Sequence, residues 1–418
     1  MHTPRATVID RIRRWLTDED LIDRLLSDVE NDRAFVTEVA YGICRWRLQL
    51  DWMIDRFCRK PPAPLLRAAL LTGLYQLFHM DTVEPYAAVN ETVEGLRPWG
   101  GEKATGFVNA VLRRALRERE AIIRELEAQP ASVRYSHPTV LLNRWKKLLG
   151  PESIPALCEW NNRRADVIIR RRNQGVSPET FTQHLQAAGI KTRVHDIGNG
   201  EWLILPRGVP ITQLPGFDDG WFSVQDPATK TAVDLLDPQP HDRVLDACAA
   251  PGGKTALIAD RVGTSTTIIA MDSNRQRLKQ LHANVARLKL NVTVAEGDIT
   301  QPPEAVAFGN FDRILLDVPC TNTGVLRRRP DARWRFSEAQ LSVMTQLQES
   351  MLTAAAGLLA PGGVLVYSTC SLEPEENELL VTRWSQQHHF ELESSRQQVP
   401  PASGCDGAYA ARLVRANA

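Results

Sequence analysis

The chain has 418 residues, of which 43% are hydrophobic and 24% are charged. This length exceeds what one hydrophobic core usually supports, so we expect two or three domains. The composition is ordinary for packed proteins and excludes a disordered or fibrous chain. Fifty Lys and Arg residues balance fifty Asp and Glu residues. The zero net charge gives no support by itself to nucleic-acid binding, which depends on local positive charge.

The sequence gives no sign of membrane insertion or export. Apolar runs stay well below the roughly 20 residues that a membrane helix needs, and the first residues lack the apolar stretch of a signal peptide. We therefore expect a cytoplasmic protein. Its seven cysteines are scattered and form no CxxC pair, which predicts free thiols and no metal site. Nothing in the sequence demands more than a monomer.

Two segments concentrate positive charge. Residues 163–172 and residues 327–335 each hold five arginines and one aspartate. Such clusters can contact phosphates on an otherwise neutral protein. A solvated charged face is the competing interpretation, and the sequence favours neither.

The first 130 residues are predicted to be helical. Residues 65–78 are apolar almost all round and indicate a buried central helix, and residues 103–120 carry apolar side chains at helical spacing. The pattern then changes. Between residues 131 and 220, short strands at 167–169 and 201–206 flank a helix over 177–190, which predicts a small α/β domain.

From about residue 221, short apolar strands alternate with amphipathic helices, which is typical of a mostly parallel sheet with covering helices. A doubly wound α/β sheet binds its ligand outside the carboxyl ends of the strands. The expected strands are residues 243–247, 267–271, 292–295, 311–316 and 363–367.

A glycine-bearing turn, DACAAPGGKT, follows the first of these strands. Gly252 and Gly253 allow a ligand to approach the backbone closely. A phosphate-binding P-loop would need glycine where this chain has Cys248, so that alternative fails. Asp272 and Asp298 follow the next two strands, where carboxylates suit the ribose and adenine of a nucleoside such as S-adenosylmethionine. Turn capping explains any one of these aspartates more easily than the whole series.

Two cysteines follow the fourth and fifth strands. Cys320 lies in LDVPCTNTG, three residues after Asp317, and Cys370 lies in YSTCS. A single cysteine is more often a small buried hydrophobe, but a pair beside an aspartate and a cofactor loop favours catalysis. Carbon-5 of cytosine becomes nucleophilic when a thiolate adds to carbon-6. A carboxyl group near ring nitrogen N3 would stabilise that adduct, and the second thiol would assist product release.

The motifs DACAAPGGKT, LLDVPCTNTG and VYSTCSLEPEEN closely resemble those of the RNA cytosine-5 methyltransferase family, and FSVQDPATK resembles its entry motif. The resemblance covers residues 221–418 and implies a Rossmann-like class I methyltransferase domain. It implies Cys370 as nucleophile, Cys320 as the product-release cysteine, and Lys254 and Asp317 near the target base. The cofactor contacts that it implies are Ala249, Ala250, Pro251, Gly252, Gly253, Lys254, Thr255, Asp272, Arg277, Asp298 and Asp317.

The amino-terminal motifs RAFVTEVAYGICRWRLQLDWMIDRF and AAVNETVEGLR resemble the NusB-like helical RNA-binding domain of the RsmB (Sun/Fmu) type within that family. The resemblance implies three domains: a NusB-like domain at 1–130, a small RRM-like α/β linker domain at 131–220, and the catalytic domain at 221–418. It implies a cytosine of 16S ribosomal RNA as target, with unassembled or partly assembled small-subunit RNA as substrate.

Two departures and three alternatives accompany this interpretation. The family has PCSGTG or PCSATG where this chain has PCTNTG, and DGFF where this chain has DGAY at 406–409. Transfer RNA is an alternative substrate of the same chemistry. A catalytically silent RNA-binding adaptor is an alternative of another class. A DNA cytosine methyltransferase would carry its nucleophile in the Pro-Cys motif, at Cys320, so the choice of Cys370 rests on the resemblance.

Overall fold

The computed structural model describes residues 3–18, 20–198 and 200–415. The chain forms two compact units. The first contains the residues up to Arg163 together with Leu326–Arg335, and the second contains Arg164–Val325 and the residues from Phe336 onward. In the described ranges, no helix is both long and apolar enough to cross a membrane.

The first unit is built from helices around a buried central one. Helix α4 (Pro64–His79) is enclosed from Ala68 to Leu77 and packs against α1, α3 and α5. The predicted all-α domain with a buried central helix is therefore confirmed, because a helix that is apolar on every side needs neighbours on every side. The helices of this unit are α1 (Pro4–Thr17), α2 (Ile22–Leu25), α3 (Arg33–Phe57), α4, α5 (Pro85–Arg117), α6 (Arg119–Glu127), α7 (Ala131–Arg134), α8 (Thr139–Leu149), η1 (Pro151–Ser153) and α9 (Ile154–Asn162).

The arginine-rich segment 327–335 is part of this helical core. Arg333 has no exposed surface and donates hydrogen bonds to the Asn162 side chain at 2.9 Å and the Ser136 carbonyl at 3.0 Å. Trp334, in α15 (Ala332–Arg335), donates to the Cys44 carbonyl at 2.7 Å. Asp331 accepts from the Ile22 amide at 3.2 Å. Neither predicted role, phosphate contact or solvated face, fits Arg333, since it is fully buried and both terminal nitrogens of its guanidinium group donate inside the protein.

The second unit contains a small four-stranded sheet of order β2-β3-β1-β4 with antiparallel neighbours. Helix α10 (Pro178–Ala187) covers it and contributes Phe181 and Leu185 to a common core. The predicted small α/β domain is thus confirmed as a fold. Its strands are β1 (Ile168–Arg171), β2 (Arg193–Val194), β3 (Trp202–Ile204) and β4 (Phe222–Val224).

Most of the other arginine-rich segment, residues 163–172, is also internal. Arg170 and Arg172 are buried and pair with Asp260, at 2.7 and 2.9 Å. Asp260 belongs to α12 (Gly253–Val262), so this ion triad joins β1 to the larger sheet. Buried arginines keep their charge when carboxylates and carbonyls satisfy their donors. Arg163 and Arg164, at the start of the segment, are exposed.

The larger sheet has seven strands in the order β10-β11-β9-β8-β5-β6-β7. Strands β5 to β9 are parallel where they pair, which confirms the predicted doubly wound sheet. Strands β10 and β11 are antiparallel additions that the sequence did not predict. The strands are β5 (Arg243–Asp246), β6 (Thr267–Asp272), β7 (Thr293–Glu296), β8 (Phe311–Asp317), β9 (Leu359–Thr369), β10 (Phe390–Gln398) and β11 (Ala408–Arg415).

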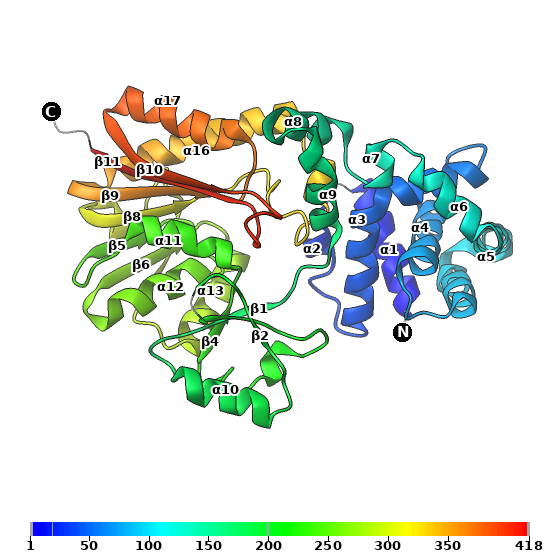
Figure 1. Cartoon of the computed structure of the whole chain (residues 1–418), viewed down its shortest axis with the longest axis horizontal. Helices are drawn as coiled ribbons and strands as arrows, with labels where there is room; N and C mark the ends of the chain where they lie inside the picture. Colours follow the sequence, from blue (N-terminus) through cyan, green and yellow to red (C-terminus); the bar gives the residue numbers. More distant parts are fainter. Residues whose placement is uncertain (1–2, 19, 199, 416–418) are drawn as a thin grey trace. The chain divides into compact units, whose positions relative to one another are not determined.

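Helices cover both faces of this sheet (Figure 1). Helices α16 (Glu338–Gly357) and α17 (Glu378–His388) pack on one face, and α11 (Lys230–Leu236), α12 and α13 (Arg275–Arg287) pack on the other. Strand β5 shows the alternation, with Leu245 in the first core and Val244 in the second. The carboxyl ends of β5, β6, β8 and β9 therefore share one edge. The domain boundaries near residues 130 and 220 stay predictions.

Candidate active site

The loop between β5 and α12 has a fixed backbone. The Ala249 amide donates to the Met271 carbonyl at 2.9 Å, and the Ala250 amide donates to the Asp272 carboxylate at 3.1 Å. Gly252 has φ +103°, and a Cβ there would stand 2.8 Å from the Leu281 side chain. That backbone conformation strongly favours glycine. The loop leads directly into α12, whose first amides offer positive charge density.

Asp272 and Arg277 brace this loop. The second Asp272 oxygen accepts from the Asn274 amide at 2.9 Å and caps the turn into α13. Arg277 donates to the Ala250 carbonyl and lies 3.6 Å from the Asp272 carboxylate. Both predicted cofactor residues therefore shape the loop in the structure.

Asp246, at the end of β5, is 1% exposed. One carboxylate oxygen accepts from the Thr255 hydroxyl at 2.6 Å, and among the described residues the other has no hydrogen-bond partner. Burial raises the pKa of Asp246 to about 7. An acceptor that is buried and unpaired fits a ligand that brings a donor, above all a cation.

Asp298 stands apart from these contacts. It is exposed and lies two residues beyond the end of β7. Its carboxylate accepts from the amide and the hydroxyl of Thr300, both at 2.8 Å. This geometry is that of a turn cap.

Lys254 and Asp317 form an ion pair between α12 and the end of β8. The Lys254 ammonium donates to one Asp317 oxygen at 2.6 Å, and the Ser368 hydroxyl donates to the other at 2.7 Å. Burial opposes the charge of Lys254, but the Asp317 charge and hydrogen bond outweigh it and raise the pKa of Lys254. The pair thus holds a positive proton donor beside a carboxylate at this edge of the sheet.

The two predicted catalytic cysteines meet beside this pair. Their sulfur atoms lie 3.2 Å apart, although 50 residues separate them in the chain. Cys320 is buried, and its hydrogen bond with Cys370 together with burial raises its pKa well above the ordinary value. Cys370 is more accessible. The structure therefore brings together Lys254, Asp317, Cys320 and Cys370, all four predicted catalytic residues.

Glu376 holds the loop that carries Cys320, and the sequence analysis gave it no role. This carboxylate has no exposed surface. It accepts from the Thr321 amide at 2.9 Å, the Thr321 hydroxyl at 2.5 Å and the Gln348 side chain at 3.0 Å. An acidic residue six positions after Cys370, inside the motif LEPEEN, was the available signal.

Asn377 performs the same task for the loop that carries Cys370. Its side chain accepts from the Thr369 hydroxyl at 2.6 Å and donates to the Ser371 carbonyl at 2.9 Å. The loop is thereby fixed on both sides of Cys370. Asn377 also donates to Gln397 of β10 at 3.0 Å, which connects this loop to the antiparallel edge of the sheet.

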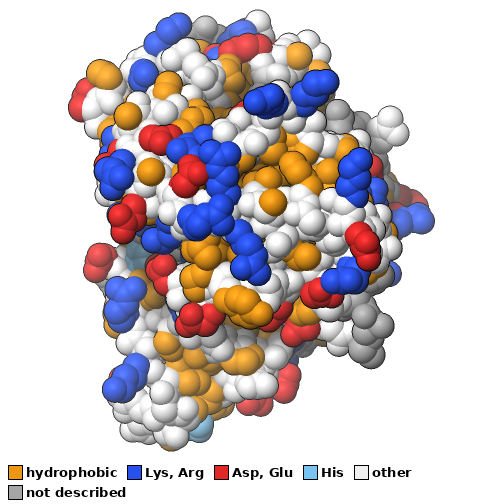
Figure 2. Space-filling model, turned by 90° about the vertical axis from the view of Figure 1, so that its right-hand side faces the viewer, with side chains coloured by type: hydrophobic (Ala, Val, Ile, Leu, Met, Phe, Trp, Pro, Cys, Tyr) orange, Lys and Arg blue, Asp and Glu red, His pale blue; other side chains and the backbone are white. Residues whose placement is uncertain are grey.

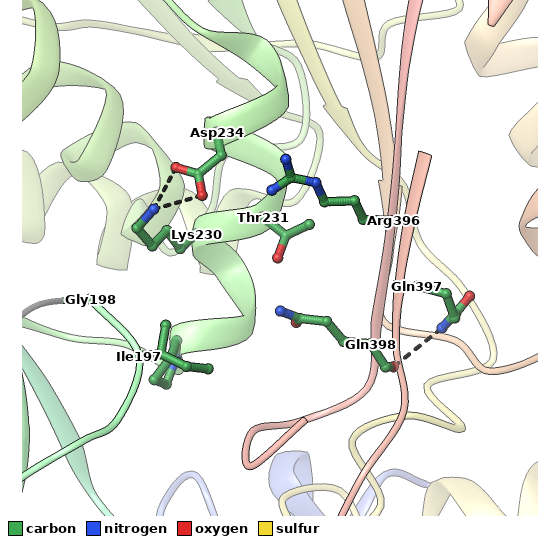
Figure 3. Close-up of a pocket in the computed structure, with 9 residues that line it drawn as sticks. Ile197, Gly198, Lys230, Thr231, Asp234, Arg396, Gln397 and Gln398 are labelled. Atoms are coloured by element: carbon green, nitrogen blue, oxygen red, sulfur yellow. Dashed lines mark hydrogen bonds and ion pairs between the residues drawn. The ribbon is translucent and has the colours of Figure 1, made fainter. Parts of the chain in front are cut away.

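Gln397 borders a separate polar pocket of about 540 Å³. Lys230, Asp234 and Arg396 point into the region between α11 and the β10 edge (Figure 3), and the Lys230 ammonium donates to both Asp234 oxygens. The pocket therefore mixes both signs of charge. Among the described residues, no cluster of three His, Cys, Asp or Glu side chains forms a metal-binding group.

A parallel sheet that presents a glycine loop, acidic strand ends and two adjacent thiols at one edge defines a methyltransferase-type α/β domain. Family models match three successive parts of the chain: the NusB family at residues 2–117, the ferredoxin-like domain of RsmF/B-like methyltransferases at 137–212, and the 16S rRNA methyltransferase RsmB/F at 233–414. Proteins named ribosomal RNA small subunit methyltransferase B from Shigella sonnei and Escherichia coli K12 are 36% identical over 398 residues, covering 92% of this chain and 91% of theirs.

The chain belongs to the 16S rRNA methyltransferase RsmB/F family. Solved structures agree with this assignment. The crystal structure of PH0851 is similar over 99% of both chains, with a TM-score of 0.81 and 25% identity. A methyltransferase homologue from Pyrococcus horikoshii is similar over 68% of this chain and 97% of its own, with a TM-score of 0.59 and 26% identity. The predicted family resemblance, with its NusB-like amino-terminal part, is confirmed.

Proposed function

We propose that this enzyme transfers a methyl group to carbon-5 of a cytosine in 16S ribosomal RNA, and that Cys370 forms a covalent bond to carbon-6 during the reaction. The observation that carries the proposal is the 3.2 Å approach of the Cys320 and Cys370 sulfur atoms beside the Lys254–Asp317 pair. One thiol serves addition and the other serves release, so a site of this chemistry needs both within reach of the same base.

S-adenosylmethionine is the methyl donor, and it supplies an electrophilic methyl carbon. The unpaired Asp246 oxygen suits the ammonium group of its methionine part. The Gly252 turn and the amides at the start of α12 suit a ligand that lies against the backbone. We propose that Ala249 to Thr255, Asp272, Arg277, Asp298 and Asp317 surround the cofactor, with Asp272 and Arg277 acting largely through the loop that they brace.

We assign different residues of this chain to the two steps of the reaction, addition and release. The Cys370 thiolate adds to carbon-6, which makes carbon-5 nucleophilic, and Lys254 and Asp317 face the N3 edge and supply a proton to the adduct. After methyl transfer, a base accepts the proton of carbon-5, the electron pair of that C–H bond forms the C5–C6 double bond, and the Cys370 sulfur leaves carbon-6 as a thiolate. Ring nitrogen N3 returns its proton to the Lys254–Asp317 pair. Cys320, held against Cys370 by the Thr321–Glu376 contacts, assists this release.

An unpaired cytosine is the substrate that fits, since a thiolate has no access to carbon-6 in a stacked helix. The helical unit offers a surface for flanking RNA: Lys60 and Lys103 line a pocket of about 420 Å³ with Phe107, and a cation next to an exposed ring suits a nucleotide. Figure 2 shows Lys and Arg side chains gathered in a strip among apolar ones on one face. Unassembled or partly assembled small-subunit RNA, a monomeric enzyme and a cytoplasmic location stay predictions.

Methylation of two RNAs by three variants tests the proposal. Cys370→Ala is expected to lose methylation and adduct formation, and Cys320→Ala is expected to accumulate a covalent RNA adduct. Cys58→Ala, a change at a partly exposed thiol of the helical unit, is the control and should behave like the parent. The parent should label carbon-5 of cytosine in 16S rRNA.

Other outcomes of the methylation experiment would each favour an alternative to the proposed function. An adduct that survives Cys370→Ala and disappears in Cys320→Ala would reverse the two roles. Methylation of transfer RNA alone would replace the substrate, and binding of RNA without any methyl transfer would favour the adaptor.

A further inference from the structure

Asn322 lies next to the Cys320 and Cys370 thiols. The reaction steps proposed above give Asn322 no role. It is the N of PCTNTG, where the related motifs have glycine or alanine. Its φ is +61°, in the left-handed region that glycine and asparagine tolerate best. The backbone of this loop therefore accepts an asparagine without requiring it, and the side chain needs a separate explanation.

Two hydrogen bonds fix which way the Asn322 amide faces. Its nitrogen donates to the Cys320 carbonyl at 2.8 Å. A carbonyl only accepts, so the nitrogen belongs on that side and the amide oxygen belongs on the other. The oxygen accepts a hydrogen bond from the Cys370 thiol, with the sulfur 3.3 Å away. The orientation follows from the Cys320 contact alone and does not depend on Cys370.

We propose that Asn322 is a positioning residue that keeps Cys370 in its protonated thiol form until RNA enters the site. The amide oxygen can only accept, so it stabilises the S–H form and disfavours the thiolate. A target nucleobase that enters the site and displaces this contact would free the Cys370 thiol for deprotonation. The inference rests on the proposed role of Cys370 as nucleophile.

The other groups facing Cys370 act in both directions. Cys320, from the loop after β8, shares a hydrogen bond with it. Lys254, from α12, is close enough for its charge to interact with Cys370, and this cation favours the thiolate. Asp317, from β8, pairs with Lys254 and weakens that influence. Loss of the Asn322 contact removes a group that disfavours the thiolate and leaves the favourable charge of Lys254 in place.

The pH dependence of Cys370 alkylation tests this role. Iodoacetamide modification of Cys370 is followed by peptide mass spectrometry from pH 6 to 10, without RNA or methyl donor. In Asn322→Gly, which keeps the left-handed backbone, Cys370 is expected to react about three-fold faster near neutral pH, with its midpoint shifted to lower pH. In Asn322→Asp the added negative charge should shift the midpoint to higher pH.

Asn310→Gly is the matched control. Asn310 also has a positive φ, 59°, and lies exposed before β8, so this change reproduces the backbone effect away from the thiols. Its alkylation profile should match that of the parent. A loop that is merely loosened would raise the rate at every pH and leave the midpoint unchanged, and that result would overturn the proposal.

Failure here is separable from failure of the proposed function. Alkylation needs neither substrate, so an unchanged midpoint in Asn322→Gly would remove the role of Asn322 while leaving the Cys370→Ala experiment intact. Conversely, a Cys370→Ala enzyme that still methylates RNA would remove the catalytic consequence without altering the measured midpoints.

Discussion

The loops after β5 and β8 follow adjacent strands of one sheet, but different parts of the chain hold them. The β5 loop takes its braces from nearby sequence: Asp272, Arg277 and Asn284 all lie within 40 residues of it and belong to the next βα unit. The β8 loop takes its main brace, Glu376, from 55 residues away. The backbone of the β5 loop thus depends on a local supersecondary unit, whereas the position of Cys320 depends on packing across the domain.

Removal of the distant brace should have the largest effect. Glu376→Ala leaves the buried Thr321 amide without its acceptor and removes one of the two acceptors of the Gln348 side-chain nitrogen, which we expect to lower the free energy of unfolding by about 3 kcal/mol. Methylation should fall about 100-fold because Cys320 loses its fixed position. Denaturant unfolding and RNA methylation kinetics measure the two effects.

Glu378→Ala is the control for this change, since Glu378 is exposed on the first turn of α17 and should leave both quantities nearly unchanged. Equal losses in the two variants would show that acidic charge near α17, and not the brace, matters.

The β5 loop should respond to pH through Asp246. Its pKa of about 7 exceeds the ordinary value of 3.8, so the folded protein keeps a proton that the unfolded chain has lost. The contribution of Asp246 to stability without cofactor is therefore most favourable below about pH 4 and is lost as the pH rises through 7. Asn lacks this ionisation, so Asp246→Asn should be more stable than the parent at pH 8, by about 2 kcal/mol.

The same change should weaken S-adenosylmethionine binding about tenfold, because the cofactor ammonium loses a charged acceptor. Thermal unfolding at pH 4 and pH 8 and calorimetric titration check these expectations. If Asp246→Asn were less stable than the parent at pH 8, burial of the ionised Asp246 carboxylate would not destabilise the folded protein, and the prediction would be wrong.

A smaller effect is expected from a glycine of the same loop. Gly252→Ala forces a left-handed backbone at φ +103° and brings a Cβ to 2.8 Å from Leu281, which should cost about 1 to 2 kcal/mol and weaken cofactor binding severalfold. Gly357→Ala, at the end of α16, places its Cβ where nothing lies within 4 Å, and is the control outside the loop. Similar losses of stability and cofactor affinity in both variants would mean that the left-handed backbone at Gly252 is not what cofactor binding requires.

The sequence predicted the loop and the strand ends well because their signals are short-range. Apolar periodicity predicted all five parallel strands. The motif DACAAPGGKT predicted the turn after β5, because the backbone angles that glycine allows depend on that residue alone. The antiparallel strands β10 and β11 were missed. Strand β10 is polar and largely exposed and lacks the apolar run that identified the central strands, whereas β11 is mostly buried and was missed although its residues are largely apolar.

The arginine-rich segments illustrate the limit of composition. Both were interpreted as surface charge, but Arg170, Arg172 and Arg333 are buried and contact carboxylates and carbonyls inside the protein. Charge count cannot separate these cases, because the partners come from Asp260, Ser136 and Asn162, which are remote in sequence.

The sequence by itself determined the order of the βα units, the glycine-bearing loop after β5 and the presence of two cysteines at successive strand ends, since these depend on residues a few positions apart. Only the tertiary structure decided that Cys320 and Cys370 come within 3.2 Å, that Glu376 and Asn377 hold their loops, and that Asn322 faces Cys370. The physical reason is that a hydrogen bond requires positions accurate to a few tenths of an ångström, and that accuracy is set by packing over the whole domain.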